Sequence, residues 1–128
     1  MHIQITAAGT VIATATLDDH ASARDFSALL PLALTLKDYA ATEKVADLPR
    51  PLSTQGAPAG YTPRTGDLSY YAPWGNLAIF HKDFGHSAGL VRLGRLQSGV
   101  EAMRRHGPLQ VRIEHLPAGA PRPSTARP

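Results

Sequence analysis

The most informative part of the chain reads Gly66-Asp67-Leu68-Ser69-Tyr70-Tyr71-Ala72-Pro73-Trp74-Gly75-Asn76-Leu77-Ala78-Ile79-Phe80-His81. Two apolar runs with the composition of β-strands lie on either side of the Pro73-Trp74-Gly75 segment. Proline and glycine at that point are typical of a turn, so the stretch predicts a β-hairpin. Successive side chains of a strand point to opposite faces, so Tyr70 and Tyr71 are predicted to face opposite sides of the hairpin.

Further short strands are predicted before and after this hairpin, from the alternation of apolar residues. They are expected at residues 3–7, 11–17, 32–36, 90–96 and 109–114. A turn near Ala8-Gly9 joins the first two. Two short helices are also predicted, one from a cap at Ser22 to about Leu30 and one from a cap at Ser98 to Gly107-Pro108. Together these elements predict an all-β fold, a closed barrel whose ends are plugged by the helices.

Residues 40–64 interrupt this pattern. Four prolines and two glycines fall in the segment, so neither a continuous helix nor a central strand is expected there. Irregular segments of this length usually cover a site or move, and the plain alternative is a long surface loop. The segment contains Arg50, which lies between two prolines that favour an extended backbone.

Composition limits the classes of protein to consider. The 128 residues, of which 43% are hydrophobic, suffice for one core without disulfides or metal. The absence of cysteine excludes a disulfide scaffold, thiolate catalysis and a Cys-ligated metal site. The N-terminus lacks the pattern of a secretory signal, and no stretch approaches the roughly 20 apolar residues of a membrane span. We therefore expect a cytoplasmic protein that does not contact a membrane.

The positive charge is concentrated near the C-terminus. Residues 1–90 carry a net charge of −2, whereas residues 91–128 carry +5. Four prolines in residues 117–128 predict a flexible, solvated tail after a domain that spans residues 1–116. Nucleic-acid binding would draw on five arginines, but no aromatic residues are interleaved with them, so we do not expect it. These arginines are Arg92, Arg95, Arg104, Arg105 and Arg112.

Two blocks of the sequence resemble cyclophilins. Residues 66–80 are similar to the cyclophilin hairpin, in which a G-x-L-S-M-A strand leads into an S-Q-F-F-I strand. Residues 93–103 are similar to the F-G-K-V-x-x-G-x-x-V-x strand and helix of that family. The match is strongest to the small bacterial cyclophilin-like proteins, and it covers roughly residues 60–107. The resemblance implies a closed cyclophilin-like barrel in which the two blocks adjoin.

The resemblance also implies where a site would lie. Cyclophilins catalyse rotation about X–Pro bonds with an arginine beside apolar walls, and this makes Arg50 the candidate catalytic residue. The family's F-H-R-x-I and F-M-x-Q-G-G-D motifs do not occur here. The family's pocket tryptophan falls near Phe84-Gly85 and its pocket histidine near Leu90, so both polar side chains are replaced. Peptidyl-prolyl isomerisation is therefore the alternative function rather than the first.

The favoured hypothesis is binding of a small molecule or a Pro-containing peptide in an aromatic groove beside the proline-rich segment. The candidate ligand-binding residues are Tyr70, Tyr71, Trp74, Phe80 and Phe84. Core packing is the alternative for Phe80 and for one tyrosine. His81, Asp83 and His86 match no metal motif, so neither a metal nor a cofactor is expected. A monomer and a homodimer are equally compatible with the sequence.

Overall fold

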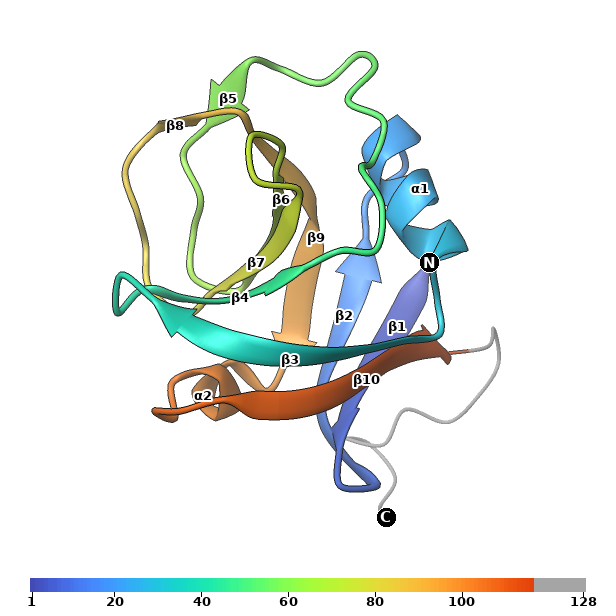
Figure 1. Cartoon of the computed structure of the whole chain (residues 1–128), viewed down its shortest axis with the longest axis vertical. Helices are drawn as coiled ribbons and strands as arrows, with labels where there is room; N and C mark the ends of the chain where they lie inside the picture. Colours follow the sequence, from blue (N-terminus) through green and yellow to red (C-terminus); the bar gives the residue numbers. More distant parts are fainter. Residues whose placement is uncertain (117–128) are drawn as a thin grey trace.

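Eight antiparallel strands close into a barrel (Figure 1). The structure is a computed structural model that describes residues 1–116, and the predicted tail at 117–128 lies outside the described residues. The barrel strands are β1 (His2–Ala7), β2 (Thr10–Leu17), β3 (Leu32–Tyr39), β4 (Glu43–Asp47), β6 (Asp67–Tyr71), β7 (Asn76–Phe80), β9 (Leu90–Ser98) and β10 (Leu109–Leu116). Around the barrel they follow the order β1-β10-β3-β4-β7-β6-β9-β2. The predicted all-β closed barrel is confirmed.

The predicted hairpin forms strands β6 and β7, which pair from Leu68 with Ile79 to Tyr71 with Asn76. The opposite edge of β6 pairs with β9, so the two blocks that resemble cyclophilins are adjacent strands of one barrel. Strand β9 in turn approaches β2 closely at Gly94, where a Cβ atom would overlap the carbonyl oxygen of Thr16. Glycine is required at this position because the two backbones leave no room for a side chain.

Side chains fill the barrel interior, because every second residue of each strand points inward. Tyr70 is one of them, and its hydroxyl accepts a hydrogen bond from the Leu52 backbone N–H at 3.2 Å. The other large, fully buried apolar side chains of the described chain are Phe26, Ile3, Ile5, Leu36, Leu68, Leu77, Ile79, Leu93, Met103 and Ile113. The barrel is therefore a packed core, and a ligand site has to lie on its outer surface.

Both helices form, but neither has the predicted cap. Helix α1 (Ala21–Ala28) is capped by His20, whose Nδ1 accepts a hydrogen bond from the Ala23 N–H at 3.2 Å. Ser22 is buried instead, and its hydroxyl donates to the Ser53 carbonyl. Helix α2 (Val100–Met103) follows Gly99, while Ser98 ends β9 and hydrogen-bonds Thr14. Both serines instead form hydrogen bonds with residues that are distant in the sequence, so neither caps the helix beside it.

The prediction that residues 40–64 contain no central strand is wrong for β4. This strand ends at Asp47, before the first proline of the segment. It was not predicted because it begins with two charged residues, Glu43 and Lys44, which are typical of an exposed loop. A two-residue strand β5 (Gly60–Tyr61) pairs with β8 (Ser87–Ala88) outside the barrel.

The irregular part between β4 and β5 runs beside α1 (Figure 1). It is fixed there because the Ser53 N–H donates to the Asp25 carboxylate at 2.7 Å. The loop is therefore tied to the end of the barrel at which α1 lies. Neither helix in residues 1–116 has the length and apolar character of a membrane span.

Candidate functional site

A hollow lined by aromatic side chains lies on the outer surface of the barrel, over strands β4 and β7. Residues 43 and 45 of β4 and residues 76, 78 and 80 of β7 point into it, whereas their neighbours at 46, 77 and 79 point into the core. The hollow has a volume of about 400 Å³, within the range of small-molecule sites. We call it the aromatic hollow; its walls are Tyr39, Glu43, Val45, Tyr71, Trp74, Asn76, Ala78, Phe80, Phe84, Ser87, Ala88 and Leu90.

Three aromatic rings from different elements meet at the rim of the aromatic hollow. Trp74 contacts Tyr71 and Tyr39 edge-to-face, with ring centroids 5.2 and 5.6 Å apart. The turn that carries Trp74 is closed by the Gly75 N–H, which donates to the Tyr71 carbonyl at 2.9 Å. Gly75 has φ +66°, a left-handed conformation that suits glycine. The turn thus holds a large ring at the surface rather than in the core.

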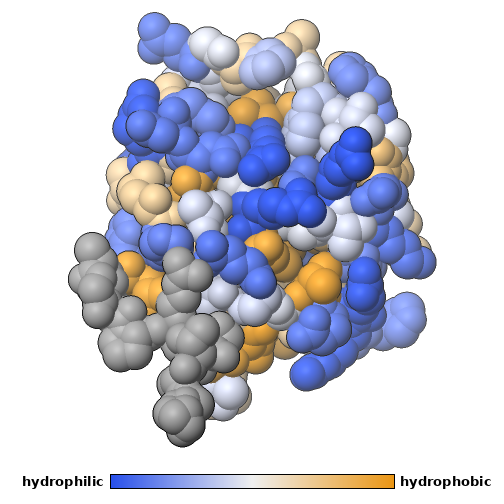
Figure 2. All heavy atoms as spheres, turned by 180° about the vertical axis from the view of Figure 1, so that it is seen from behind, coloured by the Kyte–Doolittle hydropathy of each residue, from blue (hydrophilic) through white to orange (hydrophobic). Residues whose placement is uncertain are grey.

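The rim also concentrates the exposed apolar surface of the described chain. Four large hydrophobic residues are exposed in residues 1–116, and three of them, Tyr39, Trp74 and Phe84, line the aromatic hollow. Trp74 is the most exposed of all, at 57%. Figure 2 shows one face of the molecule, on which hydrophilic side chains predominate and hydrophobic ones lie in small separate patches. Clustered exposed apolar residues on a protein surface are typical of a binding site.

Two buried polar side chains lie in the walls of the aromatic hollow. Glu43 is 8% exposed and Asn76 is 5% exposed. Glu43 Oε2 and Asn76 Oδ1 have no hydrogen-bond partner among residues 1–116. Burial raises the pKa of Glu43 to about 7, because the charged form loses its hydration and gains no cation. The apolar hollow therefore contains a carboxyl group that is close to half-ionised at neutral pH.

The structure brings together four of the six predicted site residues. Tyr71, Trp74, Phe80 and Phe84 all line the aromatic hollow. Tyr70 points into the core from the opposite face of β6, and Arg50 is exposed and lines neither this hollow nor the neighbouring pocket.

The hollow has different flanks from those that the sequence predicted. Residues 48–59 of the proline-rich segment do not line it; the segment 84–88 and strand β3 do. Sequence reasoning missed Tyr39, Glu43 and Asn76. No local sequence pattern identifies these three residues as site residues. They reach the site because Tyr39 pairs with Glu43, and Tyr71 with Asn76, across adjacent strands.

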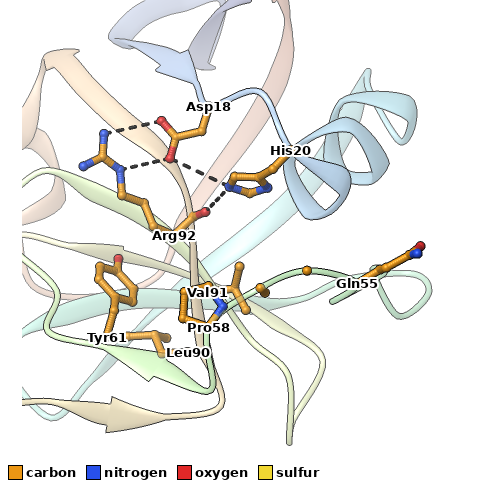
Figure 3. Close-up of a pocket in the computed structure, with 10 residues that line it drawn as sticks. Asp18, His20, Gln55, Pro58, Tyr61, Leu90, Val91 and Arg92 are labelled. Carbon is orange, nitrogen blue, oxygen red and sulfur yellow. Dashed lines mark hydrogen bonds and ion pairs between the residues drawn. The ribbon is translucent and has the colours of Figure 1, made fainter.

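A second, smaller pocket of about 290 Å³ lies next to the aromatic hollow, and Leu90 lines both. We call it the Arg92 pocket. Figure 3 shows the Arg92 guanidinium and the His20 ring on either side of the Asp18 carboxylate. Arg92 Nε lies 3.1 Å from Asp18 Oδ2. His20 Nδ1 accepts from a backbone N–H, so its Nε2 donates to the Arg92 carbonyl at 2.8 Å. An ion pair and a hydrogen bond thus connect the polar groups of this pocket, although Arg92 Nε makes no hydrogen bond within residues 1–116.

The remaining polar residues considered in the sequence do not gather into a site. No cluster of three His, Asp or Glu side chains in the described range could hold a metal ion. Of the five arginines on which nucleic-acid binding would draw, three pair with carboxylates: Arg92 with Asp18, Arg95 with Asp67 and Arg112 with Glu114.

Comparison with known proteins identifies the family. The model of the cyclophilin-like family matches residues 5–114. The chain belongs to the cyclophilin-like family. The solution structure of the hypothetical protein AF2241 from Archaeoglobus fulgidus is similar, with a TM-score of 0.59 and 15% sequence identity over 91% of this chain and 95% of that one. At that identity the likeness concerns the fold alone. No curated protein matches the chain significantly.

Two positions that the cyclophilin resemblance singles out lie in the walls of the aromatic hollow. Phe84 and Leu90 were matched to the pocket tryptophan and pocket histidine of the family, and both line the aromatic hollow. Both replacements are apolar. No arginine lines the hollow among the described residues, so it lacks the guanidinium that cyclophilin catalysis uses.

Proposed function

We propose that this cyclophilin-like protein binds a small molecule, or a side chain of a peptide, in the aromatic hollow. The observation that carries the proposal is the convergence of exposed aromatic rings on one concave surface that also holds a buried, unpaired carboxyl group. Apolar walls with a few oriented polar groups are the usual composition of a small-molecule site. The rings supply contact area, and Glu43 and Asn76 supply orientation.

Trp74 is the only tryptophan of the chain, so its fluorescence reports directly on the aromatic hollow. We expect its emission to shift when a suitable fragment binds. The titration uses a panel of benzene- and indole-sized alcohols, amides, amines and acids, with a short Ala-Pro peptide. For a fragment that binds, Trp74→Ala is expected to weaken affinity at least about tenfold by calorimetry, because it removes the largest ring.

The same substitution should cost less than about 1 kcal/mol of stability, since the Trp74 side chain is largely exposed; a core tryptophan would cost about 3–5 kcal/mol. Arg50→Ala is the matched control, since Arg50 is exposed and lies outside both pockets, and it should change neither quantity. Fragments that bind with equal affinity to wild type and Trp74→Ala, or a panel that leaves Trp74 emission unchanged throughout, would contradict the proposal.

Peptidyl-prolyl isomerisation is the second candidate, and one observation favours it. Arg92 is held by Asp18 beside the apolar Pro58, Leu90 and Val91, an arrangement of guanidinium and apolar walls that this reaction uses. We expect any isomerisation of an Ala-Pro peptide to fall about tenfold or more in Arg92→Lys and to remain in Arg50→Ala. Equal rates for wild type and Arg92→Lys, or no rate above the uncatalysed one, would remove this candidate.

A further inference from the structure

We propose that the aromatic hollow selects an organic cation, whose ammonium group lies against Glu43 and whose apolar part lies among the rings of Tyr39, Tyr71 and Trp74. The inference rests on the proposed function, because it names the chemical class of the ligand that the same site would take. It is carried by charge, by hydrogen-bond type and by ring geometry, which are independent of one another.

Charge gives the first argument. Glu43 makes no ion pair within residues 1–116, and no lysine, arginine or histidine of the described chain lines the aromatic hollow. The neighbouring residue, Lys44, does not line the hollow, and its buried ammonium group pairs with Asp38. A buried carboxylate without a partner is costly, and a ligand that carries a positive charge removes that cost on binding. An anionic ligand would find no positive group in the walls and would be repelled by Glu43.

Hydrogen-bond type gives the second argument. The unpartnered polar atoms in the walls, Asn76 Oδ1 and, when Glu43 is ionised, Glu43 Oε2, are both acceptors. They would be satisfied by N–H donors, which an ammonium group supplies and an ether, ester or ketone does not.

Ring geometry gives the third argument. Trp74 meets Tyr71 and Tyr39 at interplanar angles of 85° and 86°, so neither pair is stacked in parallel. Aromatic faces carry negative charge density and attract ammonium groups, with tryptophan the strongest of the three ring types. Aromatic faces beside an ionised carboxyl group attract a cation more strongly than a neutral ligand of the same shape.

The proposal predicts a dependence of affinity on pH. The other titratable groups in the walls are the phenols of Tyr39 and Tyr71. Behind the walls, strand β4 carries Lys44, which pairs with Asp38 of β3, and His81 follows Phe80, the register partner of Glu43. Burial and the neighbouring cations Lys44, Arg104 and Lys82 lower the pKa of His81. Between pH 6 and 8, Glu43 is therefore the group in the walls whose ionisation would change cation binding.

The experiment compares three probes that share one ring: benzylammonium, benzyl alcohol and benzoate. Binding is followed by Trp74 fluorescence and by 1H–15N NMR of the residues of the aromatic hollow, at pH 6, 7 and 8. In the wild type at pH 8 we expect benzylammonium to bind at least about tenfold more tightly than benzyl alcohol, and benzoate not to bind. Its affinity should fall about tenfold from pH 8 to pH 6, because the fraction of ionised Glu43 falls by that factor.

Glu43→Gln is the discriminating variant, since it keeps the shape of the side chain and removes its charge. It should abolish both the preference for the cation and the pH dependence between pH 6 and 8, since His81 and Asp38 are unchanged in this variant. Equal binding of benzylammonium and benzyl alcohol, or a preference that survives in Glu43→Gln, would overturn the cation inference and leave ligand binding in the hollow intact. If Glu43→Gln does not fold, the test uses the wild-type protein alone. An affinity for benzylammonium that does not change from pH 6 to pH 8 would then overturn the inference. If none of the three probes binds, the inference falls, and the wider fragment panel above judges the proposed function separately.

Discussion

Lys44→Met is expected to lower the free energy of unfolding by about 2–4 kcal/mol. Lys44 is 1% exposed, and its Nζ donates three hydrogen bonds: to Asp38 Oδ1 at 2.6 Å, to the Arg105 carbonyl at 2.6 Å and to the Gly107 carbonyl at 2.7 Å. Asp38 in turn accepts from the Gly107 N–H at 2.7 Å. These contacts fasten the segment after α2 to the barrel. Methionine fits the space but leaves an acceptor on each of three residues without its donor.

Chemical denaturation measures this effect, and Lys37→Met is the matched control. Lys37 is on the same strand as Asp38 but is exposed, so its replacement should change stability by less than about 0.5 kcal/mol. A second readout is the pKa of Asp38, which the Lys44 hydrogen bond lowers and which should rise in Lys44→Met. Equal stability of the two variants would contradict the role assigned to Lys44.

Glu43→Gln is expected to stabilise the protein at pH 8 by about 1–3 kcal/mol and to change stability little at pH 4. Burial raises the pKa of Glu43 from its ordinary 4.5 to about 7, so the folded protein holds this proton more tightly than the unfolded chain. The stability gained from the group is complete below about pH 4.5, declines between pH 4.5 and 7, and is absent above pH 7. Glutamine carries no charge at any of these values.

The measurement is urea denaturation of both proteins from pH 4 to pH 8. The difference between wild type and variant isolates Glu43, because His81, whose lowered pKa has the opposite consequence, is present in both. A stability difference that is constant over this pH range would mean that the Glu43 carboxyl has an ordinary pKa.

Alternation of apolar residues was a sufficient guide to most of the barrel. Strands β6 and β7 were predicted as two apolar runs on either side of a turn, and β9 was predicted from the alternation of leucine and valine with arginine. Strand β4 was not predicted, because its first two residues are charged and point to opposite faces of the strand. Glu43 and Lys44 are buried because β3 and β7 lie on either side of β4. The local sequence does not indicate which strands will pair with β4.

Site residues were likewise predicted where local composition identifies them, and missed where the pairing of distant strands brings them together. The density of aromatic residues between positions 70 and 84 led to Trp74 and Phe84, which a turn and a loop hold at the surface. Arg50 was chosen because it lies in the segment where the resemblance places a catalytic arginine, yet that segment packs beside α1 and leaves Arg50 exposed. Pairing between distant strands, rather than local composition, brings Glu43 and Asn76 to the aromatic rings.

The direct test of the buried acid in the aromatic hollow is a pH titration of the Glu43 side-chain carboxyl carbon by 13C NMR in the wild-type protein. A midpoint near pH 7 is predicted, together with a downward shift when benzylammonium is present. A midpoint near 4.5 in the free protein would show a hydrated carboxyl group, and the hollow would then lack the polar feature that distinguishes it from an ordinary apolar surface.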